Sequence, residues 1–222
     1  MKKSVDWADY FWPGTTVLRN KRGITDAEVL REVEYKAVAI RTATLDTAPI
    51  TKTYDAEHLR ALHGWLFQDL YVWAGHYREV PLSKFTEFAA PERISECLQH
   101  AADLIAATNW QDITAAHLAA TMAEVYGWIN YAHPFREGNG RSGRAFLDAV
   151  ADRAGRWLDY GAVDPQVWNQ RSAFSMPDLD QDRPQHHWLT PVFTAITRSL
   201  DVRRLAPPER MPQRDTGYDA GL

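Results

Sequence analysis

The stretch Asn130–Phe146, NYAHPFREGNGRSGRAF, places a histidine, an acid, two glycines around an asparagine and, just after them, two arginines within a few residues. Gly138 and Gly140 stand at the start of a predicted helix, where backbone N–H groups and the positive end of the helix dipole can bind an anion. Arg141 and Arg144 are three apart and share one face of its first turns. Positive charges near the N-terminal end of a helix are unfavourable because they repel the positive end of the helix dipole. The arginines therefore indicate an anionic ligand with several phosphates.

Each residue of this stretch also has a plain structural interpretation. His133 could only link helix to loop, and Glu137 could only favour the helix dipole. Phe135 is predicted to anchor the loop in the core, and the glycines could be ordinary turn residues. Taken together, these interpretations leave the two arginines unexplained, so the pattern favours a binding site.

A dinucleotide-binding site is excluded, although GNGRSG fits the pattern G-x-G-x-x-G. That pattern needs a strand before the glycines. Here a predicted helix, Asp112–Tyr131, and a loop through Pro134 precede them, and no strand pattern leads to Asp159 downstream. No Gly-Lys-Ser/Thr follows either, so the Walker pattern also fails.

The composition is that of an ordinary globular protein. The 222 residues are 45% hydrophobic and 24% charged, with a net charge of −4. Without a basic excess we expect no direct nucleic-acid binding, and no apolar run reaches the length of a membrane span. Cys97 is the only cysteine and the start lacks a signal-peptide core, so we expect a cytoplasmic protein.

Helical periodicity dominates the chain and predicts an all-α fold. Thr25, with Glu28 three residues on, and Asp55 are predicted N-caps, and Pro91 marks a helix start. The expected helices are 25–41, 55–70, 91–107, 112–131, 138–156, 164–175 and 187–201.

One segment, His76–Pro91, lacks a helical period and predicts a small hairpin or extended loop. The last residues are rich in proline, glycine and charge, which is typical of a flexible end. We therefore predict one helical domain over 1–203, with an N-terminal extension and a short β-hairpin flap, followed by a flexible tail over 204–222.

His133–Arg144, HPFREGNGRSGR, resembles the Fic-domain signature H-P-F-x-[D/E]-G-N-G-R-x-x-R at every specified position. Tyr71–Lys84 is similar to the Fic segment that leads into the active-site flap, and Tyr10–Asp26 resembles the N-terminal stretch of bacterial Fic proteins. The resemblance covers about residues 10–200. It implies the all-α Fic fold and transfer of AMP from ATP to a hydroxyl side chain of a target protein.

The resemblance also implies roles within the motif. His133 would be the general base that takes the proton of the attacking hydroxyl, and Glu137 would hold Mg²⁺ between the α- and β-phosphates. Pro134 and Phe135 would be structural. The residues that would bind the nucleotide are Gly138, Asn139 and Gly140 at the α-phosphate, Arg141 at the β-phosphate and Arg144 at the γ-phosphate. The related Doc phosphotransferases carry lysine at the place of Gly140, so glycine favours the AMP-transferring orientation.

The same resemblance places a target-docking flap at Ser83, Lys84, Phe85, Thr86, Glu87 and Phe88. In this family the extended flap pairs with the backbone of the target and aligns its hydroxyl. The alternative is an ordinary surface hairpin, in which Phe85 and Phe88 are only apolar cover.

Many Fic proteins carry an inhibitory helix, [S/T]-x-x-x-E-[G/N], whose glutamate pairs with the second motif arginine. Only Thr53–Glu57 and Ser83–Glu87 have this spacing here, and neither is followed by glycine or asparagine. The resemblance therefore implies a toxin restrained by a separate small antitoxin, which places a glutamate against Arg144.

The sequence does not name the target, which would offer a Ser, Thr or Tyr hydroxyl. Some toxins of this type modify type II topoisomerases, so DNA gyrase and topoisomerase IV are the family-level candidates. Two alternatives stay open: a Fic enzyme that uses another nucleotide or phosphate-containing donor, and a non-catalytic Fic-shaped binding module.

Overall fold

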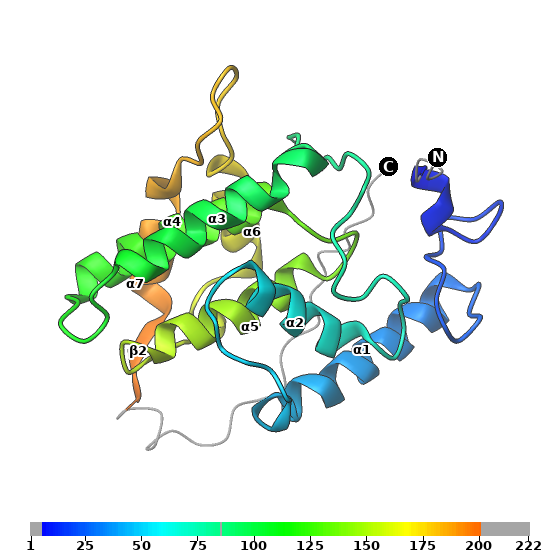
Figure 1. Cartoon of the computed structure of the whole chain (residues 1–222), viewed down its shortest axis with the longest axis horizontal. Helices are drawn as coiled ribbons and strands as arrows, with labels where there is room; N and C mark the ends of the chain where they lie inside the picture. Colours follow the sequence, from blue (N-terminus) through cyan, green and yellow to red (C-terminus); the bar gives the residue numbers. More distant parts are fainter. Residues whose placement is uncertain (1–5, 85, 201–222) are drawn as a thin grey trace.

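The computed structural model describes residues 6–84 and 86–200, and this part of the chain is mostly helical (Figure 1). Short 3₁₀ turns connect the longer elements. The helices are α1 (Ala27–Ala43), α2 (Ala56–Phe67), α3 (Ile94–Ala107), α4 (Ala115–Ala132), α5 (Asn139–Asp152), α6 (Pro165–Phe174) and α7 (Thr190–Ile196).

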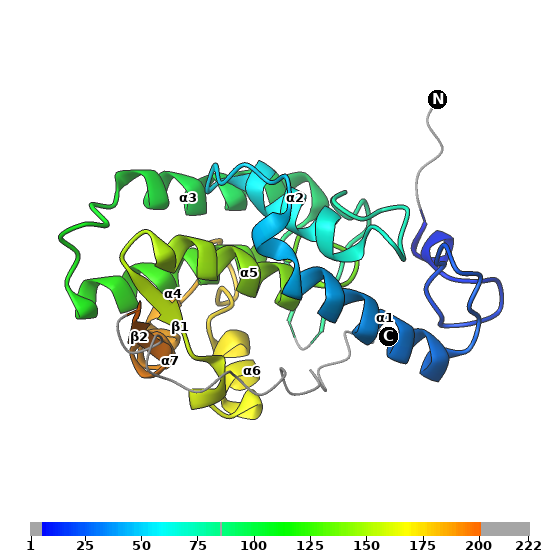
Figure 2. The ribbon, with the colours of Figure 1, turned by 90° about the horizontal axis from the view of Figure 1, so that it is seen from below.

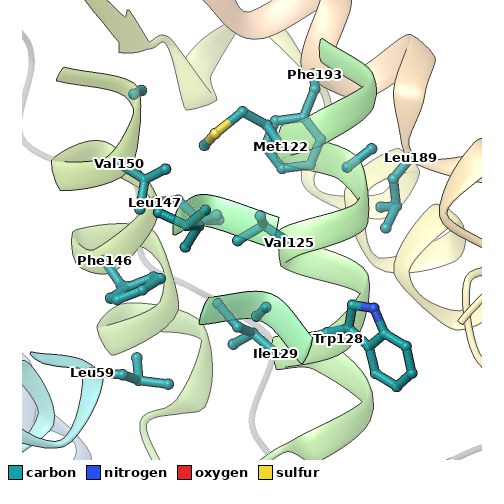
Figure 3. Close-up of a cluster of buried hydrophobic side chains, with 14 of the residues drawn as sticks. Leu59, Met122, Val125, Trp128, Ile129, Phe146, Leu147, Val150, Leu189 and Phe193 are labelled. Carbon is teal, nitrogen blue, oxygen red and sulfur yellow. The ribbon is translucent and has the colours of Figure 1, made fainter. Parts of the chain in front are cut away.

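The main core forms around α4, which packs against α3, α5 and α7. Leu118, Met122, Val125 and Ile129 form a stripe along α4, and all four are buried. Figure 3 shows α5 and α7 residues facing this stripe from either side. Burial of such side chains stabilises the fold by roughly 1.5–3 kcal/mol each, so the ends of α4 and α5 are held firmly where they meet.

A second, smaller core joins α1 to α2 at the end of the molecule away from α7 (Figures 1 and 2). It includes Val38 of α1 and Phe67 of α2, with Tyr71 just beyond. Helix α2 also packs on α5. Through α2, this cluster places α1 beside the first turn of α5.

Several predicted element ends were wrong. Asp26, not Thr25, caps α1, because its carboxylate accepts the Val29 N–H at 2.9 Å. Helix α4 begins at Ala115 behind the N-cap Thr114. The predicted caps that did hold are Asp55, which accepts the N–H groups of Glu57 and His58, and Pro91, which opens the 3₁₀ turn before α3.

The chain also forms a two-stranded sheet that the sequence analysis missed. Strand β1 (Arg156–Leu158) pairs antiparallel with β2 (Thr197–Ser199). Helices α5 and α7 therefore end earlier than predicted, at Asp152 and Ile196. Strands of three residues are too short to show an alternating pattern, which explains the miss.

The predicted hairpin between α2 and α3 is confirmed. Ser83 and Glu87 form an antiparallel bridge, and the Phe88 N–H donates to the Leu82 carbonyl at 3.1 Å. Phe85 and the predicted tail, with its boundary at 203, lie outside the described residues. No helix among residues 6–84 and 86–200 is both long and apolar enough to cross a membrane.

Candidate active site

The loop of residues 133–138, called the motif loop below, joins the buried end of α4 to the start of α5. Both of its ends are in the left-handed region: His133 has φ +38° and Gly138 has φ +83°. A Cβ at Gly138 would lie 2.3 Å from Cζ of Phe67. Both the backbone conformation and the space beside Phe67 therefore require glycine here, and the turn leads directly into the first turn of α5.

Asn139, the first residue of α5, clamps this turn. Its Oδ1 accepts the Phe135 N–H at 2.8 Å, and its Nδ2 donates to the Phe135 carbonyl at 2.8 Å. Phe135 is fully buried, as predicted. The side-chain amide of Asn139 thus fixes the shape of the loop, and its predicted contact with an α-phosphate stays a prediction.

His63 of α2 packs against the motif loop and hydrogen-bonds to it. Its ring stacks on Phe135, with centroids 3.7 Å apart. The Gly75 N–H donates to Nδ1 at 2.8 Å, so Nε2 carries the proton and donates to the Glu137 carbonyl at 2.9 Å. Burial lowers the pKa of His63 to about 3, and the ring is neutral near pH 7.

Arg78 reaches the other side of the loop from the segment before the flap. Its side chain is 2% exposed, and its own N–H donates to the Pro134 carbonyl at 2.8 Å. The guanidinium donates to four backbone carbonyls, those of Val80, Ala89, Ala132 and His133. Burial lowers the pKa of Arg78 to about 10, so it remains a cation near pH 7.

The flap meets the predicted base through one aromatic contact. The ring of Phe88 stacks on the ring of His133, with centroids 3.8 Å apart and planes 15° apart. Ser83, Lys84, Thr86 and Glu87 are exposed at the flap tip. The structure therefore brings Phe88 to the motif and leaves the other described flap residues open to solvent.

Arg141 lies between two carboxylates. Its Nη2 is 2.6 Å from Oε1 of Glu34 on α1 and 3.1 Å from Oε1 of Glu137. The Tyr71 hydroxyl donates to Glu34 as well. Burial alone would lower the pKa of Arg141, but Glu34 and then Glu137 raise it above its usual value.

Arg144, one turn further along α5, has a different environment. Its guanidinium lies 5.2 Å from the ring centroid of Tyr160 and 5.7 Å from that of Trp168. The Tyr160 hydroxyl donates to the Arg144 carbonyl at 3.3 Å. The faces of two aromatic rings therefore orient this cation.

The structure thus gathers the predicted motif residues around one helix start, with Gly140 exposed in the first turn of α5. Three residues that position them were not predicted from the sequence: Glu34, His63 and Arg78. No group of three or more His, Cys, Asp or Glu side chains within the described ranges could hold a metal ion by itself. Glu137 is the predicted metal ligand, and its carboxylate also accepts the Gly138 N–H at 2.9 Å.

Comparison with known proteins identifies relatives over most of the chain. A family model described as the Fic/DOC family matches residues 53–151. A protein of Escherichia coli K12 named "Probable protein adenylyltransferase Fic" is 32% identical over 175 residues, which cover 77% of this chain and 86% of that protein.

Solved structures agree with the fold. The N-terminal Fic domain of a VirB-translocated Bep effector protein from Bartonella quintana superposes with a TM-score of 0.76 at 25% identity, covering 89% of this chain and 95% of that one. The BepC protein of Bartonella tribocorum, solved with bound AMPPNP, gives a TM-score of 0.74 at 25% identity, with coverages of 86% and 97%.

Proposed function

This chain belongs to the Fic/DOC family, and we propose that it transfers AMP from ATP to a side-chain hydroxyl of a target protein. The observation that carries the proposal is the complete motif folded around one helix start, with His133 at the end of α4 and Arg141 and Arg144 on α5. The adenylyltransferase name of the E. coli relative and the AMPPNP bound to BepC support the reaction and the donor.

In the proposed reaction the hydroxyl oxygen of the target attacks the α-phosphorus of ATP. A new P–O bond forms, the bond from the α-phosphorus to the oxygen bridging to the β-phosphate breaks, and diphosphate leaves. His133 takes the proton of the attacking hydroxyl. A positioned general base of this kind contributes about 10²–10⁴ in rate.

The start of α5 would bind the triphosphate. In this proposal the N–H groups at Gly138 and Gly140 would bind the α-phosphate, assisted by the positive end of the helix dipole. The Gly138 N–H would then leave the Glu137 carboxylate to which it donates in this structure. Arg141 would take the β-phosphate and Arg144 the γ-phosphate. The charges of both arginines would then stabilise the diphosphate as it leaves.

Mg²⁺ fits this site through Glu137. The ion is commonly held by one or two carboxylates together with substrate phosphates, and Glu137 offers a carboxylate in the motif loop, close to the start of α5. When bound, Mg²⁺ would neutralise charge on the α- and β-phosphates. To reach it, Glu137 would give up part of its pairing with Arg141.

The flap would hold the target. Its described tip residues are exposed, and its backbone pairs internally through the Ser83–Glu87 bridge and nearby turn bonds. A target segment could therefore add to it as a further strand. The stacking of Phe88 on His133 would then place the bound hydroxyl near the base.

The proposed regulator is a small antitoxin with a glutamate that pairs with Arg144. The support is that the sequence lacks the family's own inhibitory pattern, since Ser83–Glu87 lies in the flap. A charge-assisted pair contributes about 1.5–3 kcal/mol, enough to compete with one phosphate. Recovery of such a partner from the native host, and restored transfer when its glutamate becomes glycine, would test this proposal.

The proposed targets are the type II topoisomerases, and the proposed location is the cytoplasm. Purified protein incubated with labelled ATP and Mg²⁺, together with DNA gyrase, topoisomerase IV or a bacterial lysate, tests both the reaction and the target. Mass spectrometry should find a mass of AMP on a Ser, Thr or Tyr. Labelling by another nucleotide alone would favour the alternative donor, and nucleotide binding without labelling would favour a non-catalytic module.

A further inference from the structure

Arg78 lies outside the motif, yet it contacts the chain on both sides of the flap and the end of α4. Val80 stands before the flap and Ala89 after it, and both carbonyls accept hydrogen bonds from the one guanidinium. The same group donates to the carbonyls of Ala132 and His133 at 3.1 and 2.8 Å. One side chain therefore joins both stems of the flap to the end of α4.

The chemistry of this contact requires an arginine. The guanidinium spreads its donors over a rigid plane, so it can bond carbonyls in several directions at once. The carbonyls of Ala132 and His133 also lie at the negative end of the α4 dipole, which stabilises a cation. Backbone carbonyls thus stabilise the buried charge of Arg78, and these hydrogen bonds fix the directions of the carbonyl groups.

The contact also bears on the conformation of His133. A histidine with φ +38° is uncommon and persists only when its surroundings hold it. Arg78 binds the His133 carbonyl, and the Arg78 N–H binds the next carbonyl, that of Pro134. Phe88, at the end of the flap next to Ala89, stacks on the His133 ring.

We infer that Arg78 is a positioning residue that couples the target-docking flap to His133 and so sets the alignment of the acceptor hydroxyl with its base. The effect of Arg78 on AMP transfer rests on the proposed function. Its effect on the structure of the flap does not depend on that function. Arg78 acts through the backbone at Val80, Ala89 and His133, and it does not touch the nucleotide-binding face of α5 in this assignment.

The variant Arg78→Gln tests the coupling. We expect the Kd for AMPPNP, measured by calorimetry, to stay within about threefold, because the phosphate-binding start of α5 is unchanged. We expect kcat for AMP transfer to the acceptor that wild type labels to fall about 10²-fold, since a misplacement of about 1 Å can cost that much. Arg78→Lys, which keeps the charge and some donors, should recover part of this rate.

Amide hydrogen exchange gives a readout that does not depend on activity. In Arg78→Gln the N–H groups of Phe88 and Ala89, bonded to Leu82 and Tyr131, should exchange at least tenfold faster. The N–H of Ser142, bonded to Gly138 in α5, should be unaffected. The matched control Arg41→Gln removes a two-bond pair between α1 and Asp69, which lies just after the end of α2, and should change neither exchange at the flap nor kcat.

The outcomes separate the two proposals. A wild-type protein that labels no acceptor, together with faster flap exchange in Arg78→Gln, would overturn the proposed function and leave the coupling intact. A kcat and a flap exchange equal to wild type in a folded Arg78→Gln would overturn the coupling. If Arg78→Gln does not fold, the same two measurements on Arg78→Lys decide, with wild-type values for both again counting against it.

Discussion

The motif loop, which contains His133, and the flap tip are held very differently. The loop is bonded from three directions, by His63, Arg78 and Asn139, and its residues are largely buried. The flap tip is exposed and closes on itself through one bridge and a few turn bonds. A rigid loop suits chemistry that needs fixed geometry, and open backbone at the tip suits pairing with a changing partner.

The largest effect is expected where the loop carries chemistry. His133→Ala should lower the rate of AMP transfer by about 10²–10⁴, because the proposed base would act on the acceptor hydroxyl only. AMPPNP binding should be retained. Transfer of labelled AMP and calorimetry measure the two properties, with the exposed His117→Ala as the control. A wild-type transfer rate in His133→Ala would show that another group is the base.

Expression of the wild-type protein in a bacterial host should also slow growth in a His133-dependent way, since the sequence lacks the internal inhibitory pattern. Growth curves of cells that make wild type or His133→Ala at equal levels measure this. Equal growth would count against the toxin proposal and leave the transfer reaction itself open to the direct assay.

The next effect tests how tightly the loop is built. Gly138→Ala combines a left-handed backbone with a Cβ placed 2.3 Å from Phe67, so we expect it to destabilise the protein by about 2–5 kcal/mol. Gly155→Ala is a matched control: its φ is +63°, but no atom lies within 4 Å of the added Cβ. Its cost should be about 1 kcal/mol.

Denaturant unfolding of both variants gives the comparison. Equal losses of stability at the two positions would mean that the loop relaxes around Phe67, and that it is less rigid than its hydrogen bonds indicate.

The difference between loop and tip also explains what the sequence could reveal. The motif is contiguous, so its residue types and spacing indicated an anion site, and helical periodicity predicted a helix over 112–131, where α4 runs from Ala115 to Ala132. Arg78 and His63 are more than fifty residues from their partners in the loop. Local patterns do not show which distant backbone groups a buried polar side chain will meet.

A signal for two of the missed residues was nevertheless present. Glu34 stands four residues from both Leu30 and Val38, so it interrupts the buried stripe of α1. His63 likewise lies among Leu59, Leu62 and Leu66 on the buried face of α2. A polar group in an apolar stripe needs a buried partner, and here the partners are Arg141 and the Glu137 carbonyl.

The neutral His63 predicts a pH dependence of stability. Its pKa is about 3 in the folded state, against 6.5 in the unfolded chain. Between these values the unfolded chain binds the proton and the folded chain does not, so this contribution to stability is present above pH 6.5 and is lost as the pH falls. The loss is about 1.4 kcal/mol for each pH unit well below 6.5.

Denaturant unfolding at pH 7.5 and 5.5 measures this slope. His63→Gln should unfold with a smaller difference between the two pH values than wild type, and the exposed His117→Gln should keep the wild-type difference. A wild-type slope in folded His63→Gln would mean that other groups, such as the buried His58, account for the pH dependence.

A smaller effect is expected where the flap first meets the loop. Phe88→Ala removes the ring stacked on His133, a contact that contributes about 0.5–1.5 kcal/mol. Transfer should fall up to about tenfold, with AMPPNP affinity unchanged. Phe174→Ala, which removes a half-exposed ring that packs on Trp188, is the control. An unchanged rate in Phe88→Ala would mean that this ring only covers apolar surface and has no role in AMP transfer.

The smallest effect is expected at the flap tip, if the target pairs with its backbone. Thr86→Ala keeps every main-chain group and should change AMP transfer by less than about twofold. Thr86→Pro removes one N–H at the same place, and the loss of one hydrogen bond to the target, about 0.5–1.5 kcal/mol, should slow transfer roughly 2–10-fold. AMPPNP binding, measured in parallel, should be the same in both variants because neither changes the start of α5. A larger loss in Thr86→Ala than in Thr86→Pro would mean that side chains, not backbone, recognise the target, and the flap would then be a surface hairpin with a specific side-chain contact.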